Sequence, residues 1–263
     1  MKNIYGNIFR FNKNTLSKTV NILKKNSIIG LPTETVYGLA GNAYSKTSIK
    51  KIFKLKKRPT KNPLIIHYSN IKYAKKDVIL NKDFYKLYEK FSPGPITFVL
   101  KKTKDSQVNS TATAKLKTIA IRFPQHKIIR TILNKINFPL AIPSANQSSG
   151  ISPVTAKDVA EEFNKKIQMI IDGGKSKIGI ESTVVDLTGK VKILRPGAIS
   201  LAEISKVLKK QVVCIKKIKL IKSPGSLKKH YSPGIPIVLN QKNSVKEHAF
   251  IIFGKKYKMS KNS

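Results

Sequence analysis

Apolar residues along the chain recur at two spacings, and each spacing predicts a different kind of element. Recurrence every three or four residues predicts amphipathic helices, the first of which ends before Asn26. Short apolar or β-branched runs bounded by Pro, Gly, Asn and Ser predict strands. The helices are expected around residues 16–23, 49–53, 82–91 and 155–163. The strands are expected around residues 27–31, 64–68, 96–100, 118–123, 140–142, 169–172, 183–187 and 193–195.

One predicted strand has an alternation that points to chemistry. From Thr118 to Phe123, the apolar side chains of Ile119, Ile121 and Phe123 share one face, and Arg122 lies on the other. A cation inside a strand is costly unless it is paired. Arg122 is therefore expected to meet a carboxylate, which is either that of a substrate or that of an internal salt bridge.

The order of these elements favours an α/β fold, a twisted mixed sheet with flanking helices, because short strands alternate with helices without regular βαβ spacing. We expect one domain over residues 1–210 and, because Pro and Gly punctuate the next segment, a linker over residues 211–235. Residues 236–263 hold two possible strands and form a remnant too short to bury a core of its own. Residues 104–117 are polar and rich in Ser and Thr, which predicts a mobile loop.

Composition limits the class of protein. The 263 residues are 40% hydrophobic, enough for a sizeable core, and they contain no run of 18 apolar residues that could cross a membrane. The N-terminus lacks the apolar segment of a secretory signal, and the single cysteine excludes an internal disulfide. Cys214 lies in the apolar run 212–215 and is expected to be a core residue rather than a nucleophile. These features predict a soluble cytoplasmic protein.

The net positive charge of the chain is compatible with polyanionic partners but does not identify one. Lys and Arg total 52 against 13 Asp and Glu, a net charge of +39. Such a surface would attract any polyanion, RNA included, in a salt-dependent manner. The lysines are spread along the entire chain, however, so the charge permits contact with nucleic acid but does not demonstrate it.

The stretch from Lys56 to His67 combines cations with a rigid turn. Lys56 and Arg58 follow a predicted helix, which Pro59 is expected to stop at Arg58, and Pro63 leads into a strand. Lys supplies a point charge and Arg a bidentate fork, both of which suit phosphate. The stretch predicts a site for a polyphosphate or another anion. The alternative is that these cations only reflect a lysine-rich chain.

Two other turns place small hydrogen-bonding residues at strand ends. Residues 32–40 contain several hydroxyls, a carboxylate and a phenol between a Pro and a Gly. So many hydrogen-bonding groups suit a small polar ligand. The alternative is a Thr-rich turn whose side chains satisfy its own backbone. Residues 143–150 would let a nucleotide approach the backbone closely. Arg195 precedes Pro-Gly and repeats the pattern of Arg58, a cation held at a strand end by a stiff turn. The chain has no Walker P-loop, no dinucleotide-binding glycine motif and no zinc-ligand spacing.

Four motifs, taken together and in order, resemble one family. They are Pro32–Leu39, Lys56-x-Arg58 with Asn62-Pro63-Leu64, Ser144-x-Asn146 and Glu181-Ser182-Thr183. This set resembles the YrdC-type threonylcarbamoyl-AMP synthases over about residues 10–205, and the Pro/Gly segment from Pro224 to Pro233 resembles the linker of the family's long form. That form continues into a full C-terminal domain, of which this chain would carry only the remnant.

The resemblance implies a fold and a reaction. The fold is a YrdC-like twisted sheet with a basic concave face. The reaction is that of a nucleotidyltransferase, in which L-threonine, bicarbonate or CO2, and ATP give threonylcarbamoyl-AMP and pyrophosphate. A separate threonylcarbamoyl transferase would then use the product to form threonylcarbamoyladenosine in tRNA. Direct contact between this chain and tRNA is left open.

The resemblance also implies roles for individual residues. Lys56 and Arg58 would act on the triphosphate. Threonine would be held by Thr35, His67, Ser182 and, at its carboxylate, Arg122, in a pocket lined by Thr33 and walled by Tyr37. The nucleotide would be held by Arg58, Asn62, Thr118, Ser144, Asn146, Ser152 and Arg195, with Tyr231 closing over it from the linker. For His67, which ends an apolar strand, a satisfied core histidine is the alternative.

Mg2+ is expected to accompany ATP. It would be bound mainly through phosphates and water, because the implied site offers few carboxylates. Glu34 and Glu181 are the candidate protein contacts, and for each of them a structural role is the alternative.

Two rival interpretations belong to other classes. A non-catalytic RNA-binding module is supported by the net charge, and it predicts salt-sensitive RNA binding that survives the loss of Arg58 or Ser144. A YrdC-like carbamoyl-adenylate former that acts on carbamoyl phosphate in hydrogenase maturation is disfavoured, because the chain lacks the acylphosphatase and zinc-finger segments expected beside such a domain.

Overall fold

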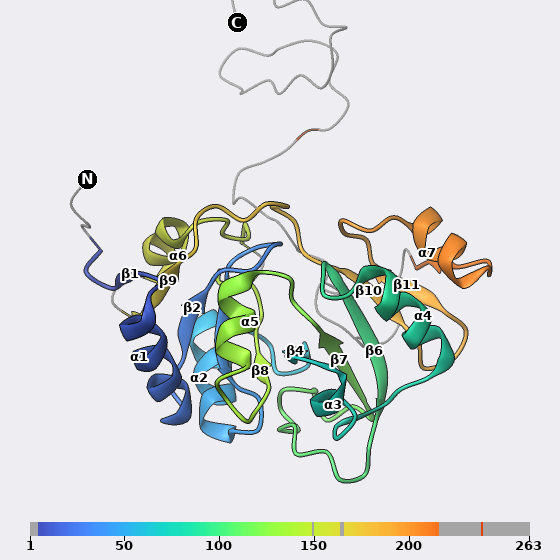
Figure 1. Ribbon diagram of the computed structural model, residues 1–263, viewed down its shortest axis with the longest axis horizontal. Helices are drawn as coiled ribbons and strands as arrows, with labels where there is room; N and C mark the ends of the chain where they lie inside the picture. Colours follow the sequence, from blue (N-terminus) through green and yellow to red (C-terminus); the bar gives the residue numbers. More distant parts are fainter. Residues whose placement is uncertain (1–4, 149, 164–165, 216–237, 239–263) are drawn as a thin grey trace, which may run out of the picture. The chain divides into compact units, whose positions relative to one another are not determined.

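A mixed sheet of twelve strands forms the centre of the computed structural model, which describes residues 5–148, 150–163, 166–215 and 238 (Figure 1). The strands are β1 (Ile8–Arg10), β2 (Ile29–Leu31), β3 (Gly38–Asn42), β4 (Ile65–His67), β5 (Val78–Ile79), β6 (Ile96–Lys102), β7 (Thr118–Arg122), β8 (Leu140–Ala141), β9 (Ile170–Asp172), β10 (Thr183–Asp186), β11 (Lys192–Arg195) and β12 (Val213–Cys214). The helices are α1 (Lys13–Lys24), α2 (Lys46–Lys56), α3 (Ile71–Ala74), α4 (Lys82–Phe91), α5 (Lys127–Leu133), α6 (Ala156–Phe163) and α7 (Leu201–Leu208). The α/β fold and the predicted helices and strands outside the undescribed C-terminal region are therefore confirmed, with shifts of a few residues at their ends.

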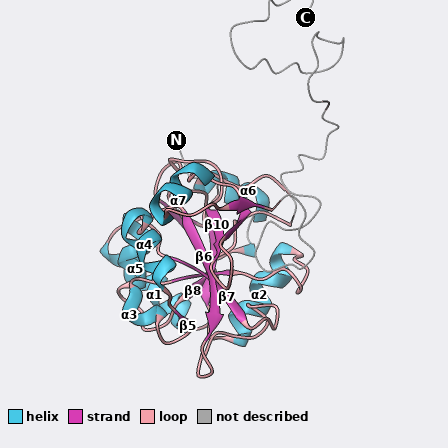
Figure 2. Cartoon of the chain, turned by 90° about the vertical axis from the view of Figure 1, so that its right-hand side faces the viewer, coloured by secondary structure: helices cyan, strands magenta, loops and turns pink. Residues whose placement is uncertain are grey.

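Strand order brings distant parts of the chain together. The order is β1-β9-β2-β3-β8-β4-β7-β6-β10-β11-β12, and β5 pairs with β6 outside this path. Strands β4 and β7 are parallel and pair His67 with Arg122, while β6 runs antiparallel to β7 and pairs Thr97 with Arg122. The sheet is thus mixed, as predicted, and the strands run through the interior with helices around them (Figure 2). His67, Arg122 and Thr97 become neighbours across three strands.

The two faces of β7 pack into separate apolar clusters. Ile119, Ile121 and Phe123 belong to the largest cluster of buried residues. On the opposite face, Ala120 packs in a smaller cluster with Ile65 and other residues of β6, β10 and β11. The alternation in the sequence therefore predicted both faces correctly, and Arg122 lies on the face of Ala120 at the end of the strand.

Helix α2 ends earlier than Pro59 alone would require. The Ser45 side chain caps its start by accepting from the N–H of Ser48 at 3.2 Å. At its end, Lys57 adopts a left-handed conformation with φ 49°, and the N–H of Arg58 reaches back to the carbonyl of Phe53 at 3.0 Å. Arg58 lies outside the helix, as predicted, and the helix ends one residue earlier than Pro59 implies because the left-handed Lys57 closes it first.

The segment 104–117 has no regular secondary structure, which agrees with the predicted loop, and several of its residues pack against the core. Val108 and Ala112 are buried, and the N–H of Leu64 donates to the carbonyl of Ala112 at 2.8 Å. The buried carboxylate of Asp77 accepts from the hydroxyl of Ser106 at 2.7 Å. The polar composition concealed these anchors, because only two apolar side chains make the packing contacts.

Cys214 is exposed, which contradicts the prediction of a core position. Strand β12 pairs in parallel with β11 and is the last strand in the order of the described sheet. Val212 is buried, whereas Val213 and Cys214 are exposed. An apolar run at a sheet edge can thus remain partly in solvent.

The predicted C-terminal features lie almost entirely outside the described residues. The chain divides into two compact units, Met1–Ser232 and Pro233–Ser263, and Val238 is the described residue of the second. Tyr231, most of the predicted linker and the two possible strands of the remnant fall outside the described residues. Within the described parts of the chain, no helix is long and apolar enough to cross a membrane.

Candidate functional site

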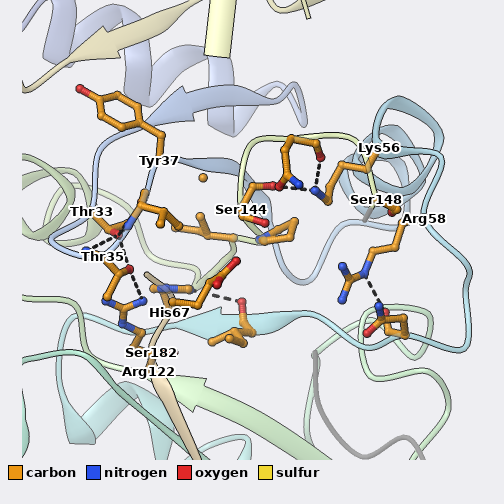
Figure 3. Close-up of a pocket in the computed structure, with 18 of the residues that line it drawn as sticks. Thr33, Thr35, Tyr37, Lys56, Arg58, His67, Arg122, Ser144, Ser148 and Ser182 are labelled. Carbon is orange, nitrogen blue, oxygen red and sulfur yellow. Dashed lines mark hydrogen bonds between the residues drawn. The ribbon is translucent and has the colours of Figure 1, made fainter. Parts of the chain in front are cut away.

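A cleft opens where several strands end and their turns meet (Figure 3). It encloses about 740 Å³, including its open mouth. Its walls come from the turn between β2 and β3, the end of α2, the ends of β4, β7 and β11, the turn after β8 and the start of β10. The polar and charged residues of the lining are Thr33, Thr35, Tyr37, Lys56, Arg58, Asn62, His67, Arg122, Ser144, Asn146, Ser148, Glu181, Ser182 and Arg195.

Lys56 is almost completely buried, with 1% of its surface exposed. Its ammonium donates to the carbonyl of Ser144 at 2.7 Å and to that of Asn146. Burial, followed by repulsion from Arg58, lowers the pKa of Lys56 well below its usual value. An ammonium has three N–H donors, so two fix the turn after β8 and one remains for a ligand in the cleft.

Arg58 is held by the rigid turn that follows it. Its Nε donates to the carbonyl of Asn62 at 3.0 Å, and one terminal nitrogen donates to that of Pro63 at 2.8 Å. Both acceptors are neutral, so the charge of the guanidinium is not cancelled by them. Burial, followed by repulsion from Arg195, lowers the pKa of Arg58 to about 9, which leaves the group cationic at neutral pH.

Arg195 and Ser182 also line the cleft and are joined by hydrogen bonds. Arg195 donates to the carbonyl of Ser182 from Nε at 3.2 Å and from a terminal nitrogen at 3.0 Å, and the same nitrogen lies 3.2 Å from the Ser182 hydroxyl. That hydroxyl also bonds the hydroxyl of Thr97 at 2.7 Å. Burial lowers the pKa of Arg195 to about 10, with Glu181 opposing the shift. Ser182 therefore positions a cation as well as lining the cleft.

Arg122 forms the internal salt bridge that was one of its two predicted alternatives. It donates to Glu34 Oε1 at 2.6 Å, to the Thr35 hydroxyl at 2.9 Å and to the carbonyl of Gly94 at 3.3 Å. Burial alone would raise the pKa of Glu34, but the charge and hydrogen bond of Arg122 outweigh it and lower that pKa. These bonds occupy three of the five guanidinium N–H groups, so two remain for a ligand.

His67 is a neutral imidazole beside these charges. It is buried, and its Nδ1 lies 3.2 Å from the carbonyl of Ile65. Burial, followed by repulsion from Arg122, lowers the pKa of His67 to about 3. Since Nδ1 faces an acceptor, it carries the proton, and Nε2 is left as an acceptor for a ligand that donates a hydrogen bond.

The turn between β2 and β3 lines the cleft and satisfies part of its own hydrogen bonding, which was one of its two predicted alternatives. The Thr33 hydroxyl lies 2.6 Å from the carbonyl of Val36 and 2.8 Å from the Thr35 hydroxyl, so this part of the turn satisfies itself. Tyr37 is buried and its ring points away from the cleft, with the hydroxyl donating to the carbonyl of Gly174 at 2.7 Å (Figure 3). Tyr37 thus supports the cleft from behind rather than presenting its phenol to it.

Four buried oxygens of the lining lack a hydrogen-bond partner among the described residues. They are Asn62 Oδ1, Asn146 Oδ1, Ser148 Oγ and Glu181 Oε2. An unsatisfied buried polar atom costs about 1–3 kcal/mol. Their concentration at one cleft indicates that a polar ligand or water completes the site.

Most of the predicted site residues meet in this cleft. Lys56, Arg58, Asn62, Ser144, Asn146 and Arg195 line it together with Thr35, His67, Arg122 and Ser182. Ser152 lies behind the lining and donates to Glu181 Oε1 at 2.5 Å. Thr118 is the exception, because it begins β7 whereas Arg122 ends it, about 13 Å away along an extended strand. The nucleotide contact of Thr118 stays a prediction, and Tyr231 lies outside the described residues.

Ser148 and Ile65 also line the cleft, although no individual site role was predicted for either of them. Ser148 follows the Ser-x-Asn motif within a run of small polar residues, which was the one signal that could have identified it. Ile65 gave no such signal, because its place in an apolar strand predicts burial and nothing more.

The chemistry of the cleft is that of anion binding. Among the residues that the structure describes, four basic side chains line it, those of Lys56, Arg58, Arg122 and Arg195, together with one carboxylate, that of Glu181. Among the described residues, no group of three or more His, Cys, Asp or Glu side chains could hold a metal ion by itself. Such a site can position polyanions and stabilise charge that develops on them.

Comparisons with known proteins give matches over most of the chain. The Sua5/YciO/YrdC family model, described as telomere recombination, matches residues 21–197. The model of the threonylcarbamoyl-AMP synthase C-terminal domain matches residues 199–262. Threonylcarbamoyl-AMP synthase of Pyrococcus abyssi is 39% identical over 82% of this chain, and that of Bacillus subtilis is 35% identical over 85%. The chain spans 65% and 66% of these two relatives.

Solved structures agree with the fold. The crystal structure of P. abyssi Sua5 complexed with L-threonine is 36% identical, with a TM-score of 0.81 over 86% of this chain and 68% of that one. Escherichia coli YciO, at 21% identity, has a TM-score of 0.67 over 75% of this chain and 98% of that one, which shows the fold alone.

Proposed function

The chain belongs to the Sua5/YciO/YrdC family, and from that premise we propose that it is an L-threonylcarbamoyladenylate synthase. As a nucleotidyltransferase it would convert L-threonine, bicarbonate or CO2, and ATP to threonylcarbamoyl-AMP and pyrophosphate. The observation that carries the proposal is the cleft itself. Cations suited to a triphosphate, Lys56, Arg58 and Arg195, and a pocket around Arg122 and His67 suited to an amino acid open into one space.

The threonine end is supported by complementary charge and hydrogen bonding. Two N–H groups of Arg122 are free to bind a carboxylate while Glu34 fixes the guanidinium. The acceptor Nε2 of neutral His67 suits a hydroxyl or amine donor. A relative of similar fold is crystallised with L-threonine, which is consistent with this assignment.

The phosphate end explains how the reaction would proceed without a strong base. The amine of threonine takes up CO2 and becomes a carbamate, which is already an anion. One of its oxygens attacks the α-phosphorus of ATP, and the bond to the bridging oxygen breaks as pyrophosphate leaves with the electron pair. Lys56, Arg58 and Arg195 would hold the phosphates in line and stabilise the charge on pyrophosphate, so catalysis rests on positioning and electrostatics.

Mg2+ is proposed to accompany ATP. It would neutralise phosphate charge and polarise the reacting phosphoryl oxygens. Of its two candidate protein contacts, Glu34 is occupied by Arg122, whereas Glu181 lines the cleft with Oε2 unpartnered among the described residues. The site therefore fits a metal ion bound chiefly through phosphates and water.

The product defines the partners that we propose. Threonylcarbamoyl-AMP is a mixed anhydride, so a threonylcarbamoyl transferase must consume it to modify tRNA. Direct contact with tRNA is consistent with the net charge of +39. All of these steps use cytoplasmic substrates, and we propose a cytoplasmic location.

Pyrophosphate release tests the proposal. With ATP and bicarbonate present, release should depend on L-threonine, and Arg58→Ala should reduce kcat/KM by about 100-fold or more because a charged phosphate contact is lost. Lys61→Ala, which removes an exposed cation from the same turn, is the matched control and should change the rate less than about twofold. Release that is absent, or indifferent to threonine, would reject the synthase and favour the RNA-binding module.

A further inference from the structure

Glu181 is the one acidic side chain among the described residues of the cleft lining, and half of its carboxylate is unused. Oε1 accepts from the Ser152 hydroxyl at 2.5 Å, which fixes the side chain. Oε2 is buried and has no partner in the described part of the chain. A buried carboxylate oxygen without a donor or a cation is costly, so the loaded site is expected to supply one.

The nearby cations do not supply that partner. The charge of Glu181 raises the pKa of both Lys56 and Arg195, partly offsetting the effect of burial on each, so the carboxylate lies close enough to interact with them. Arg195 nevertheless donates to Ser182, and Lys56 donates to the carbonyls of Ser144 and Asn146. Within the described residues, the carboxylate of Glu181 therefore has no ion-pair contact, although it lies near the groups proposed to bind phosphates.

Asn146 presents a second unused oxygen. Its Nδ2 donates to the carbonyls of Gln147 and Gly150, both at 2.8 Å. Turning the amide over would lose both bonds, so Oδ1 must be the free atom. Oδ1 is buried and also lacks a partner among the described residues.

The two oxygens share one chemistry. Amide and carboxylate oxygens are the protein ligands that Mg2+ prefers. A carboxylate beside a triphosphate repels it unless a divalent cation lies between them. Building on the proposed function, we propose that Glu181 Oε2 and Asn146 Oδ1 are the protein oxygens that hold the metal ion of Mg–ATP, directly or through its water ligands. Glu181 provides the charge and Asn146 a neutral contact.

The test compares ATP binding to the full chain with and without Mg2+, by calorimetry and without threonine. In EDTA, Glu181→Gln should bind ATP about 3- to 10-fold more tightly than wild type, because a repulsive charge is removed while Gln still accepts from Ser152. In excess Mg2+ the order should reverse, with the variant about 10-fold weaker. Asn146→Ala should reduce the gain in affinity from Mg2+ without improving binding in EDTA.

Glu162→Gln is the matched control. Glu162 is exposed and outside the cleft lining, accepts from the N–H of Gln147 at 3.0 Å, and like Glu181 raises the pKa of Lys56. Its loss should change ATP affinity by the same factor in EDTA and in Mg2+. If Glu181→Gln also changes both affinities by one common factor, the metal role is overturned.

Deoxy-ATP identifies the competing partner, because ribose hydroxyls also donate to such acceptors. If the effect of Glu181→Gln disappears with 2′-deoxy-ATP or 3′-deoxy-ATP, Glu181 binds ribose and the metal role is again overturned. A different result would reject the proposed function itself: wild type that binds ATP neither in EDTA nor in excess Mg2+. Binding of ATP by wild type with no gain from Mg2+ rejects the metal role alone.

Discussion

At the scale of single residues, burial has different effects on the titratable groups of the cleft: the arginines stay charged at neutral pH, whereas the histidine is neutral. Arg58 and Arg195 stay cationic at neutral pH despite burial, because the ordinary pKa of a guanidinium is so high. His67, with an ordinary pKa near 6.5, becomes a neutral imidazole under the same conditions. The amino-acid end of the cleft thereby gains a hydrogen-bond acceptor without gaining another positive charge.

The lowered pKa of His67 predicts how stability depends on pH. The pKa of His67 is about 3 in the native state and about 6.5 in the unfolded state. The free energy of unfolding is therefore unaffected by this group above pH 6.5 and decreases as pH falls from 6.5 toward 3, because the unfolded state takes up the proton first. Between pH 6.5 and 5, wild type should lose up to about 1.4 kcal/mol per pH unit more than His67→Gln, which does not titrate. Urea unfolding at pH 7, 6 and 5 measures this difference. Parallel pH dependence in the two proteins would show that His67 is protonated normally.

Sequence motifs predicted which residues meet, but not how each is engaged. Lys56 ends α2, Arg58 and Ser144 lie in turns that meet at the cleft, and the resemblance of their motifs to the family is what predicted one shared site. The partner of Arg122 was beyond sequence reasoning, because Glu34 lies 88 residues earlier and only the sheet brings them together. Thr118 begins β7, at the end of the strand away from Arg122, and its predicted contact with the nucleotide stays a prediction.

At the scale of elements, the end of α2 decides where Arg58 points. Lys57 closes the helix in the left-handed region, and the next residue turns into the segment that holds the guanidinium. In the sequence, Pro59 predicted the end of the helix, and no local pattern indicated a role for Lys57. A left-handed lysine is disfavoured, so this conformation is imposed by the surrounding structure and cannot be read from the local sequence. The boundary of this helix was therefore predicted less well than its existence.

Replacing Lys57 by Gly should stabilise the protein. Gly adopts φ near 49° without the steric cost that a lysine bears there, and we expect a gain of about 1 kcal/mol in the free energy of unfolding. Lys209, with φ 53° after α7, is the matched position far along the chain, and Lys209→Gly should give a similar gain. Urea unfolding measures both variants, and ATP affinity should stay within about twofold of wild type because Lys57 is exposed. A loss of stability in both variants would show that the left-handed lysines make compensating contacts.

At the scale of the whole molecule, the dominant property is uncompensated positive charge. The sequence has 52 basic and 13 acidic residues, and the described part of the chain contains three salt bridges. Two of these, Lys157–Glu161 and Lys210–Asp83, involve exposed lysines and contribute little. Mutual repulsion among the remaining lysines therefore opposes the compact state at low ionic strength.

Salt should consequently stabilise the fold while weakening any contact with nucleic acid. The screening length falls from about 30 Å at 0.01 M salt to about 10 Å at 0.1 M, so raising NaCl from 0.01 to 0.3 M should raise Tm by several degrees. Over the same range, affinity for tRNA should fall steeply, because binding to phosphates releases counterions.

Arg58→Ala separates general screening from the binding of an anion in the cleft. This variant lacks one of the cleft cations but keeps nearly all of the net charge, so screening predicts the same rise in Tm as in wild type. A rise that is lost in Arg58→Ala would instead mean that chloride stabilises the protein by occupying the phosphate site. A Tm that is flat or falls with salt would contradict the repulsion argument. It would mean that the lysines are spaced widely enough for solvent to screen them already.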